Sequence, residues 1–463
     1  MRIARPWYLF ILLAAILTQS SGCATLPNVS HVIDEVPIAR QPRQIVSSQG
    51  QLSPRKSRAV MERVKRSVEP TDVLSRHTAV VESVTTTPLT KGNRVTLLAD
   101  GQATYRAMFK VIRHARESIN LESYIIEDDE TGRLFASLLL QKQGEGVQVN
   151  LIYDCMGSLN TPDSFFRRLR DAGIQVVGFN PINLLAPRED WNLSRRDHRK
   201  ILIVDGNVAI IGGINISKVY SSSPFKGKPK ESGAVHWRDT DIQIEGPAVA
   251  EFQKLFHTTW LQQKGAELSG RNYFPVIKEA GTALVRVVGS TPGESNRIPF
   301  IVYVSAISFA EYSIHLTNSY FIPDEQILQA LVEAAERGVD VKIILPGITD
   351  SALVLHAQRY HYARLLKSGV KIYEHRTSLL HAKTAVVDSI WSTIGSTNLD
   401  FLSLLNNDEV NAVILNHDFA VEMETMFTRD LLASRQITCD EWEKRALLPR
   451  FREWFINIFK RLF

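Results

Sequence analysis

Two stretches of the chain carry the same polar residues at the same spacing. The first, HRKILIVDGNVAIIGGIN, contains the set His198, Lys200, Asp205, Gly212, Gly213 and Asn215. The second, HAKTAVVDSIWSTIGSTN, contains the set His381, Lys383, Asp388, Gly395, Ser396 and Asn398. One histidine near a lysine on a strand is most often a structural residue, but chance does not explain two copies with identical internal spacing. We therefore interpret the two sets as the halves of one candidate site.

Together, two histidines, two lysines and two asparagines suit attack at a phosphodiester. A neutral histidine can attack phosphorus and form a covalent intermediate. A second, protonated histidine can give its proton to the leaving alkoxide, which is worth about 10²–10⁴ in rate. Lysine and amide donors can hold the non-bridging oxygens, each worth roughly 3 kcal/mol in the transition state. This chemistry needs no cofactor and no metal, and the cysteines Cys23, Cys155 and Cys439 lack metal-ligand spacing.

Each set must be positioned by a β-hairpin. HRKILIVD reads as a strand, GN as a tight turn, and VAIIGG as the returning strand. Side chains two residues apart on a strand share a face, so each histidine should project with its lysine toward one site. The aspartates Asp205 and Asp388 lie at or past the turn, and we expect them to fix the hairpin. The glycines permit close backbone approach and the asparagines offer amide donors, so we expect Gly213, Asn215, Ser396 and Asn398 to bind substrate.

The hairpins belong to an internal repeat. SINLESYIIEDDETGRLFASLLLQKQGEGVQVNLIYD matches SIHLTNSYFIPDEQILQALVEAAERGVDVKIILP as strand, turn, amphipathic helix, Gly-Val and strand. RLRDAGIQVVGF then matches RLLKSGVKIYEH, each a helix end followed by glycine and a strand. Strands that alternate with helices predict an α/β fold with helices on both faces of the sheet. We place the first repeat at 71–272 and the second at 273–437.

The paired sets resemble the HKD signature of the phospholipase D superfamily, and the resemblance covers roughly residues 90 to 435. It implies two α/β repeats, each with a mixed sheet flanked by helices, packed face to face around one shared active site. It also implies a catalytic set made of the two HKD triads: His198, Lys200, Asp205, His381, Lys383 and Asp388. By resemblance His198 is the nucleophile and His381 the general acid, although the sequence itself is symmetric. Asp239 in WRDTDIQIEGP and Glu409 in NNDEVNAVI correspond to family acids that orient the histidines, and either could instead be a structural salt-bridge residue.

The surrounding segments resemble those of bacterial cardiolipin synthases, notably GGINIS, WRDTDIQIEGPAV and GSTNLDFLSLLNNDEVN. Two positions depart from that pattern, Ser123 in place of a tyrosine and Leu402 in place of an arginine. The resemblance implies transfer of a phosphatidyl group from phosphatidylglycerol, or a related donor, to make cardiolipin. The alternatives are a phospholipase D that uses water, a nuclease, and a membrane scaffold with an inactive site.

Net charge and composition distinguish only weakly between phospholipid and nucleic acid as the partner. The net charge of +5 is compatible with any phosphate-bearing partner. The basic residues lack clear aromatic interleaving, so we expect no nucleic acid partner. The sequence gives no indication of the oligomeric state.

Both termini suggest contact with a membrane. Residues 1–22 read as a signal peptide, and SSGC resembles a lipobox that would make Cys23 a lipidated N-terminus, with Ser20 where a leucine is usual. An uncleaved anchor and plain secretion are the alternatives. Lipidation implies a lipoprotein of the bacterial cell envelope that faces the periplasm, and Ala24 would fit outer-membrane sorting. We expect residues 23–70 to form a polar tether with one short helix near SRAVMERVKRS.

The C-terminal segment 438–463 is predicted to contain a basic amphipathic helix. Apolar residues recur at steps of three and four: Leu447, Leu448, Phe451, Trp454, Phe455, Ile458, Phe459 and Leu462. From Lys444 onward there are six basic residues and one acidic residue. Two interpretations are equally consistent with this pattern. The apolar face could lie on an anionic membrane, or it could pack on the catalytic domain.

Overall fold

The computed structural model describes residues 25–35, 44–181, 195–221, 236–292 and 297–463. The predicted signal peptide and Cys23 lie outside these residues. Among the helices in these ranges, none is both long and apolar enough to cross a membrane.

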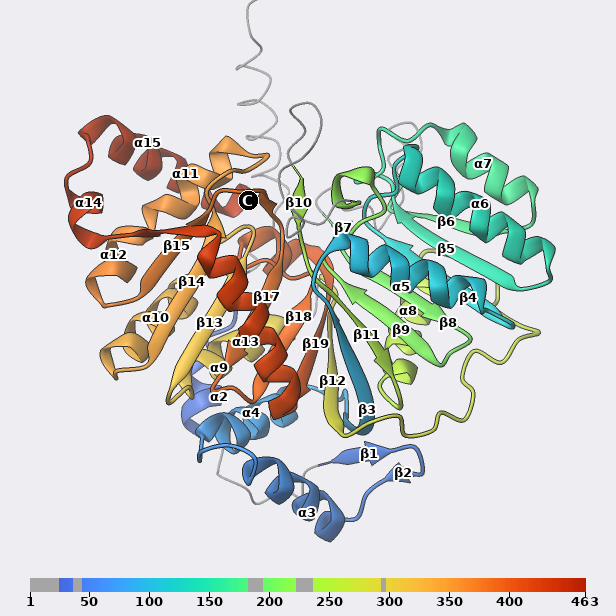
Figure 1. Cartoon of the computed structure of the whole chain (residues 1–463), viewed down its shortest axis with the longest axis horizontal. Helices are drawn as coiled ribbons and strands as arrows, with labels where there is room; N and C mark the ends of the chain where they lie inside the picture. The colour runs from blue at the N-terminus through green and yellow to red at the C-terminus, as the bar shows by residue number, and fades with distance from the viewer. Residues whose placement is uncertain (1–24, 36–43, 182–194, 222–235, 293–296) are drawn as a thin grey trace, which may run out of the picture.

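The strands of the two repeats follow the same order on either side of a central pair (Figure 1). From the outer edge inward, the first repeat consists of β6 (Gln175–Phe179), β5 (Gln148–Asp154), β4 (Ser118–Ser123), β8 (Lys200–Val204), β9 (Val208–Gly212), β11 (Asp241–Glu245) and β3 (Leu89–Leu98). In the second half, β20 (Ser434–Ile437) lies at the outer edge, antiparallel to β15. The matching order is then β15 (Lys371–His375), β14 (Asp340–Pro346), β13 (Ser313–Asn318), β17 (Lys383–Val387), β18 (Trp391–Gly395), β19 (Asn407–Leu415) and β12 (Ala283–Ser290). Strands β3 and β12 pair antiparallel and join the two halves. The predicted α/β duplication with a mixed sheet is confirmed.

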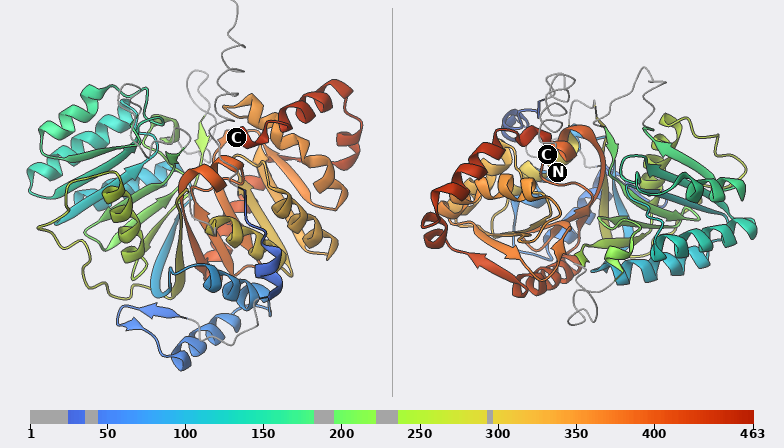
Figure 2. Two further views of the ribbon diagram at one scale, coloured as in Figure 1. Left: turned by 180° about the vertical axis from the view of Figure 1, so that it is seen from behind. Right: turned by 90° about the horizontal axis from the view of Figure 1, so that it is seen from above.

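Helices cover both faces of this sheet (Figure 2). Those of the first repeat are α5 (Gly101–Arg113), α6 (Glu130–Gly144), α7 (Asp163–Asp171) and α8 (Val249–Gln262). Those of the second are α9 (Ile298–Ser308), α10 (Glu325–Glu336), α11 (Ala352–Tyr360), α12 (Tyr362–Lys367) and α13 (His417–Leu432). Parallel strands need such crossovers, and β4, β5 and β6 are parallel to one another.

One of the apolar cores belongs to both repeats. It combines Phe252 and Trp260 of α8 with Phe419 and Met423 of α13, all 4% exposed or less. Because burial of each large apolar side chain is worth about 1.5–3 kcal/mol, this shared core fixes one repeat against the other. The site between the repeats therefore rests on a rigid support.

The described part of residues 23–70 is not a tether, contrary to the sequence prediction. Strand β1 (Ile45–Ser47) pairs with β3 and with β2 (Gly50–Gln51), and helix α3 (Pro54–Lys65) follows. Ile45 and Met61 are 0% and 2% exposed and belong to the core of the second repeat. A few apolar residues at helical and strand spacing thus suffice to dock a segment whose overall composition is polar.

A buried ion pair joins α13 to the centre of the molecule. The guanidinium of Arg238 donates to both carboxylate oxygens of Asp430 at 3.0 and 2.6 Å, and both residues are 1% exposed or less. We expect Asp430→Ala to lower the free energy of unfolding by about 3–5 kcal/mol, because it leaves a buried charge without its partner. Urea denaturation followed by circular dichroism measures this loss. The double variant Arg238→Met/Asp430→Leu is the control, and it should recover most of the stability; equal losses in both variants would contradict the explanation.

Candidate active site

Each HKD histidine is held beside the other repeat by a short strand. Strand β7 (Arg196–Asp197) runs parallel to β19, and the His198 N–H donates to Asp408 O at 2.9 Å. In the same way β10 (Trp237–Arg238) runs parallel to β16 (Leu379–Leu380), and the His381 N–H donates to Arg238 O at 2.7 Å. This reciprocal pairing brings the two sets to the interface between the repeats.

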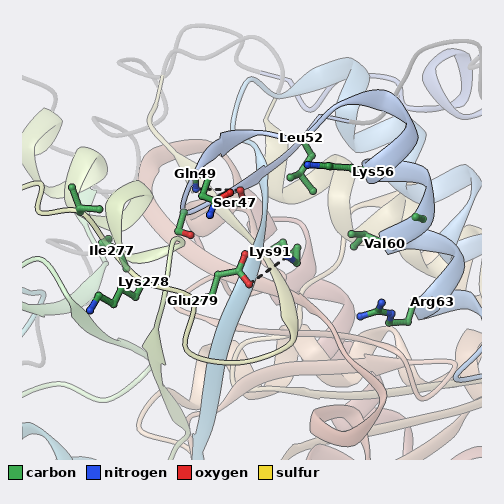
Figure 3. A pocket seen from close by; sticks show the side chains of 13 residues that line it. Ser47, Gln49, Leu52, Lys56, Val60, Arg63, Lys91, Ile277, Lys278 and Glu279 are labelled. Carbon is green, nitrogen blue, oxygen red and sulfur yellow. Dashed lines mark hydrogen bonds and ion pairs between the residues drawn. The ribbon is translucent and has the colours of Figure 1, made fainter.

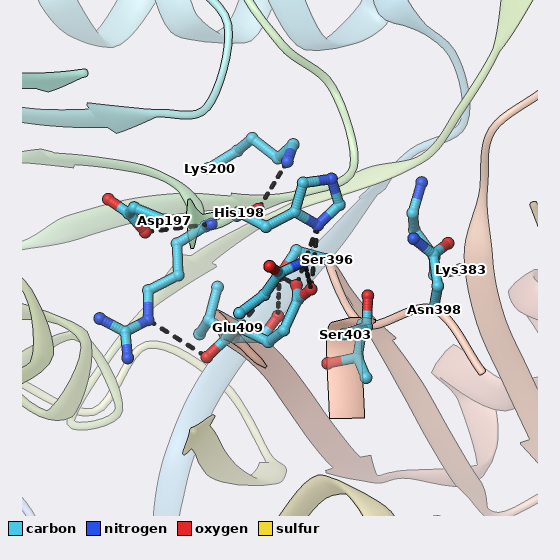
Figure 4. Close-up of polar contacts among 12 residues, drawn as sticks. Asp197, His198, Lys200, Lys383, Ser396, Asn398, Ser403 and Glu409 are labelled. Atoms are coloured by element: carbon cyan, nitrogen blue, oxygen red, sulfur yellow. Dashed lines mark hydrogen bonds and ion pairs between the residues drawn. The ribbon is translucent and has the colours of Figure 1, made fainter. Parts of the chain in front are cut away.

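A carboxylate from the opposite repeat contacts each imidazole. Both Glu409 oxygens lie 3.1 Å from His198 Nδ1, as Figure 4 shows. Asp239 Oδ2 lies 2.6 Å from His381 Nδ1. A carboxylate at Nδ1 places the ring proton there, so Nε2 of each ring is left for chemistry. Asp239 and Glu409 thus lie where the orienting role predicted for them would require, and each acid contacts the histidine of the other repeat.

The two lysines lie buried beside the histidines, at 2% and 1% exposure. Lys200 Nζ donates to His198 O at 2.5 Å, and Lys383 Nζ donates to His381 O. Burial, together with the charge of Lys383 and against the pull of Glu409, lowers the pKa of Lys200 to about 7. Burial likewise lowers the pKa of Lys383 to about 8. The site thus holds concentrated positive charge that an anionic substrate would stabilise.

The charges of both lysines act on both imidazoles, as expected for groups gathered at one site. Burial lowers the pKa of His198, and Lys200 and Lys383 lower it further. Burial lowers the pKa of His381 to about 4, with contributions from Lys383 and Lys200. Although burial opposes its charge, Glu409 has a pKa below its usual range, because His198, Lys200 and Ser396 face it. A neutral histidine beside an ionised carboxylate is the form that can act as a nucleophile.

These lysine pKa values predict a loss of activity at alkaline pH. The cationic form of a lysine with a lowered pKa is lost as the pH rises through that value, so kcat/KM for an anionic phosphodiester should fall through about pH 7 to 8. Arginine keeps its charge, so the Lys200→Arg variant should shift this limb to higher pH, whatever its maximal rate. A pH series of initial rates tests both statements. An alkaline limb that stays in place in Lys200→Arg would show that another group titrates there.

Gly213 and Ser396, which we expected to bind substrate, contact the carboxylates of Asp239 and Glu409, a role that the sequence did not predict. A Cβ on Gly213 would lie 2.3 Å from an oxygen of Asp239, so only glycine leaves room for that carboxylate. At the equivalent position Ser396 Oγ donates to Glu409 Oε2 at 2.5 Å. The two residues therefore set the position of the acids that hold the histidines.

The two asparagines, Asn215 and Asn398, differ in the hydrogen bonds that their side chains make within the protein. Asn215 accepts from the Ile125 N–H at 3.1 Å and donates to Tyr220 Oη at 3.2 Å, so its amide braces the loop rather than serving substrate alone. Asn398 accepts from Ser319 Oγ at 2.6 Å, and Figure 4 shows it next to Lys383 beside His198. Asn398 therefore remains a candidate for substrate binding.

Asp205 and Asp388 stand at the far ends of the hairpin strands. Their φ angles are +52° and +51°, in the tight turns of β8–β9 and β17–β18. The Asp205 carboxylate accepts the N–H groups of residues 116–118 at 2.8–3.1 Å, and Asp388 does the same for residues 311–313 at 2.8–3.3 Å. Seven residues of extended chain separate Asp205 from His198, about 23 Å at 3.3 Å per residue. They are structural residues of the motif and lie away from the reacting atoms, although the resemblance counts them in the catalytic set.

An aromatic shell around the histidines was not predicted from the sequence. The rings of Tyr124 and His198 lie 5.0 Å apart between centroids, and Trp237 lies 5.1 Å from His381. The ring of Tyr320 lies 6.2 Å from that of His381 between centroids. Trp237 stands two residues before Asp239, so strand alternation was a signal that could have identified it. Aromatic rings packed around the histidines would exclude water from a bound substrate and so strengthen the electrostatic interactions there.

The described residues show no competing centre. Among them, no group of histidine, cysteine and acidic side chains could hold a metal ion. A groove near the N-terminal segment is lined by residues such as Ser47, Lys56 and Lys91, as Figure 3 shows, and none of the HKD residues lines it.

Comparison with known proteins agrees with this geometry. A family model described as "Cardiolipin synthase, PLD-like domain" matches residues 108–260 and 303–431. Cardiolipin synthase of Listeria monocytogenes is 36% identical over 367 residues, which are 79% of this chain and 74% of that protein. Cardiolipin synthase of Halalkalibacterium halodurans is 34% identical over 371 residues, which are 79% and 71% of the two chains. The crystal structure of phosphatidylserine synthase from Haemophilus influenzae shares the fold, with a TM-score of 0.60 over 82% of this chain and 96% of that chain at 14% identity. The chain therefore belongs to the phospholipase D superfamily, in the family of cardiolipin synthase-like proteins.

Proposed function

We propose that this protein transfers a phosphatidyl group from phosphatidylglycerol to a second phospholipid and so makes cardiolipin. The observation that carries the proposal is the crossed arrangement of the site, in which each buried histidine faces a carboxylate from the other repeat. Relatives at 34–36% identity that are cardiolipin synthases support this choice of reaction.

In the first half-reaction, His198 Nε2 attacks the phosphorus of the donor. The bond from phosphorus to the headgroup glycerol breaks, and the leaving oxygen takes a proton from His381 Nε2. The products are glycerol and phosphatidyl-His198. The bound phosphodiester anion raises the pKa of His381 from its low value in the free site, so the acid gains its proton with the substrate.

In the second half-reaction, His381 accepts the proton of a headgroup hydroxyl on another phosphatidylglycerol. The hydroxyl oxygen attacks phosphorus, the phosphorus–nitrogen bond breaks, and His198 is released with cardiolipin as the product. Lys200, Lys383 and Asn398 would hold the non-bridging oxygens in both steps. Water in place of the lipid hydroxyl would make the protein a phospholipase D.

Product analysis tests the proposal directly. Purified protein is incubated with phosphatidylglycerol vesicles beside a His198→Ala control, and the lipids are separated by thin-layer chromatography and identified by mass spectrometry. Cardiolipin and glycerol, both absent from the control, are the expected products. Phosphatidic acid without cardiolipin would show hydrolysis, and no lipid product would exclude phosphatidylglycerol as the donor.

For the cellular location we propose a lipid anchor at Cys23, with the catalytic part in the periplasm. The basis is the sequence of residues 1–23, in which an apolar stretch precedes SSGC. Mass spectrometry of the protein purified from membranes should find diacylglycerol on Cys23, and Cys23→Ser should release the protein from the membrane fraction. An unmodified Cys23 in membrane-bound protein would contradict lipidation.

A further inference from the structure

The helix near the C-terminus presents its apolar face to solvent. Helix α15 (Leu447–Asn457) and the turn after it carry what we call the α15 surface: Leu447, Leu448, Phe451, Trp454, Phe455, Ile458 and Phe459. Each of these side chains is 42–77% exposed. Apart from Trp454 they are leucine, isoleucine and phenylalanine, which are usually buried. A contiguous exposed apolar patch of this kind marks an interaction site. The interpretation in which this face packs on the catalytic domain is therefore wrong.

The opposite side of α15 fixes the helix to the second repeat. Glu453 is 4% exposed, and its carboxylate accepts from the guanidinium of Arg445 at 2.6 and 3.0 Å. Ile456 and Phe463 pack in a small cluster with Val354 of α11. The aromatic face thus points outward because the other face is held by a partly buried ion pair and apolar contacts.

The same segment reaches the edge of the active site. Leu402 N–H donates to the carbonyl of Phe463 at 2.9 Å, and Lys460 Nζ lies 5.6 Å from the ring of Phe401. Phe401 and Leu402 stand three and four residues after Asn398, the last residue of the second HKD set. Phe463 also shares its cluster with Tyr320, whose ring lies 6.2 Å from His381. In Figure 1, α15 and the C-terminus lie on the same upper side of the molecule as β10.

We propose that the α15 surface docks on the anionic bilayer that contains the substrate, and so sets the mouth of the active site against the headgroups. Its aromatic side chains would enter the interface between headgroups and acyl chains. Arg450, Arg452 and Arg461 on the same segment are exposed and complement anionic headgroups. The proposal depends on the proposed function only for the identity of the lipid substrate.

Charge also favours a bilayer over a second copy of the chain. A symmetric dimer places the same patch on both sides of its interface, so the arginines of the two copies would face one another. Like charges across an interface oppose association, whereas an anionic surface attracts them.

Bromine quenching tests the contact on the full chain. Vesicles of phosphatidylglycerol with brominated acyl chains are added to the wild type and to Trp454→Phe, and tryptophan emission is recorded. We expect quenching in the wild type, most of it lost in Trp454→Phe and weakened by salt. The difference in quenching between the two proteins comes from Trp454 alone, so membrane binding through another part of the chain does not affect it. Equal quenching in both proteins would overturn the proposal.

Activity on two forms of the lipid tests the consequence. Phe451→Ser/Phe455→Ser should lower turnover of phosphatidylglycerol vesicles at least tenfold and leave turnover of monomeric short-chain phosphatidylglycerol unchanged. The matched control is Leu134→Ser/Leu261→Ser, at side chains 55% and 58% exposed on α6 and α8, and should behave as the wild type on both forms. Equal loss on both forms would overturn the docking role.

Two further outcomes distinguish membrane docking from the proposed reaction itself and from dimerisation through the α15 surface. A wild type inactive on both lipid forms would refute the proposed reaction, while the quenching result would still decide the docking. A wild-type dimer that dissociates in Phe451→Ser/Phe455→Ser by sedimentation, without quenching of Trp454, would identify a second copy as the occupant and overturn the proposal.

Discussion

The His198→Asn variant should have no measurable turnover, whereas His381→Asn should lose activity in proportion to how poor the leaving group is. His198 would supply the electron pair that forms the covalent bond, and asparagine has no nucleophilic ring nitrogen to replace it. His381 would supply a proton, so its loss with a glycerol leaving group should cost about 10²–10⁴ in rate. A nitrophenyl ester of phosphatidic acid releases nitrophenolate, which needs no proton in order to leave. Its rate of cleavage should therefore depend little on His381.

The decisive measurement is a single-turnover reaction with the nitrophenyl donor. In His381→Asn we expect a burst of nitrophenol and a phosphatidyl adduct on the peptide that contains His198. The same burst in His198→Asn would reverse the roles that the resemblance assigns. Circular dichroism of both variants is the control for folding. We expect both to fold, because one imidazole is small compared with the apolar cores of the protein.

The second large effect should come from Glu409. Glu409→Gln replaces an acceptor oxygen by an amide that can donate, so His198 would lose the partner that fixes its tautomer, and we expect kcat to fall by about 10²–10⁴. Glu409 raises the pKa of His198, so its loss should also move the acid limb of kcat/KM to lower pH. A purely structural role would not move that limb.

Ser396→Ala is the matched control for Glu409→Gln, because it removes one hydrogen bond to the same carboxylate. A hydrogen bond to a charged group is worth about 1.5 kcal/mol, so we expect a loss of roughly tenfold. If Ser396→Ala lost as much as Glu409→Gln, or the acid limb of Glu409→Gln stayed in place, Glu409 would not act through His198.

Local sequence patterns predicted most of the fold and identified the reactive groups. Strand and helix periods are properties of neighbouring residues, so the matching segments of the two repeats predicted β4 and β13, and the strands that follow them, at equivalent places. Spacing also identified His198 and His381 with their lysines. The role of Asp205 and Asp388 in the hairpin turns followed from their odd separation from the histidines.

The remaining features depend on which segments meet in space. No local period indicates that β7 of the first repeat pairs with β19 of the second, or that β16 of the second repeat pairs with β10 of the first, so the crossed pairing of each acid with the other histidine appeared only in the structure. The contacts of Gly213 and Ser396 with those acids followed from the same crossing.

At the C-terminus, periodicity identified an apolar face but not what it rests on, because a sequence pattern is the same whether a face meets protein, lipid or water. The sequence by itself thus determined the two repeats and the chemistry of their histidines and lysines. Only the tertiary structure decided which carboxylate holds which histidine, and that α15 turns Phe451 and Trp454 outward. Those choices are made by long-range packing, through Glu453 beneath the helix and the core shared between the repeats.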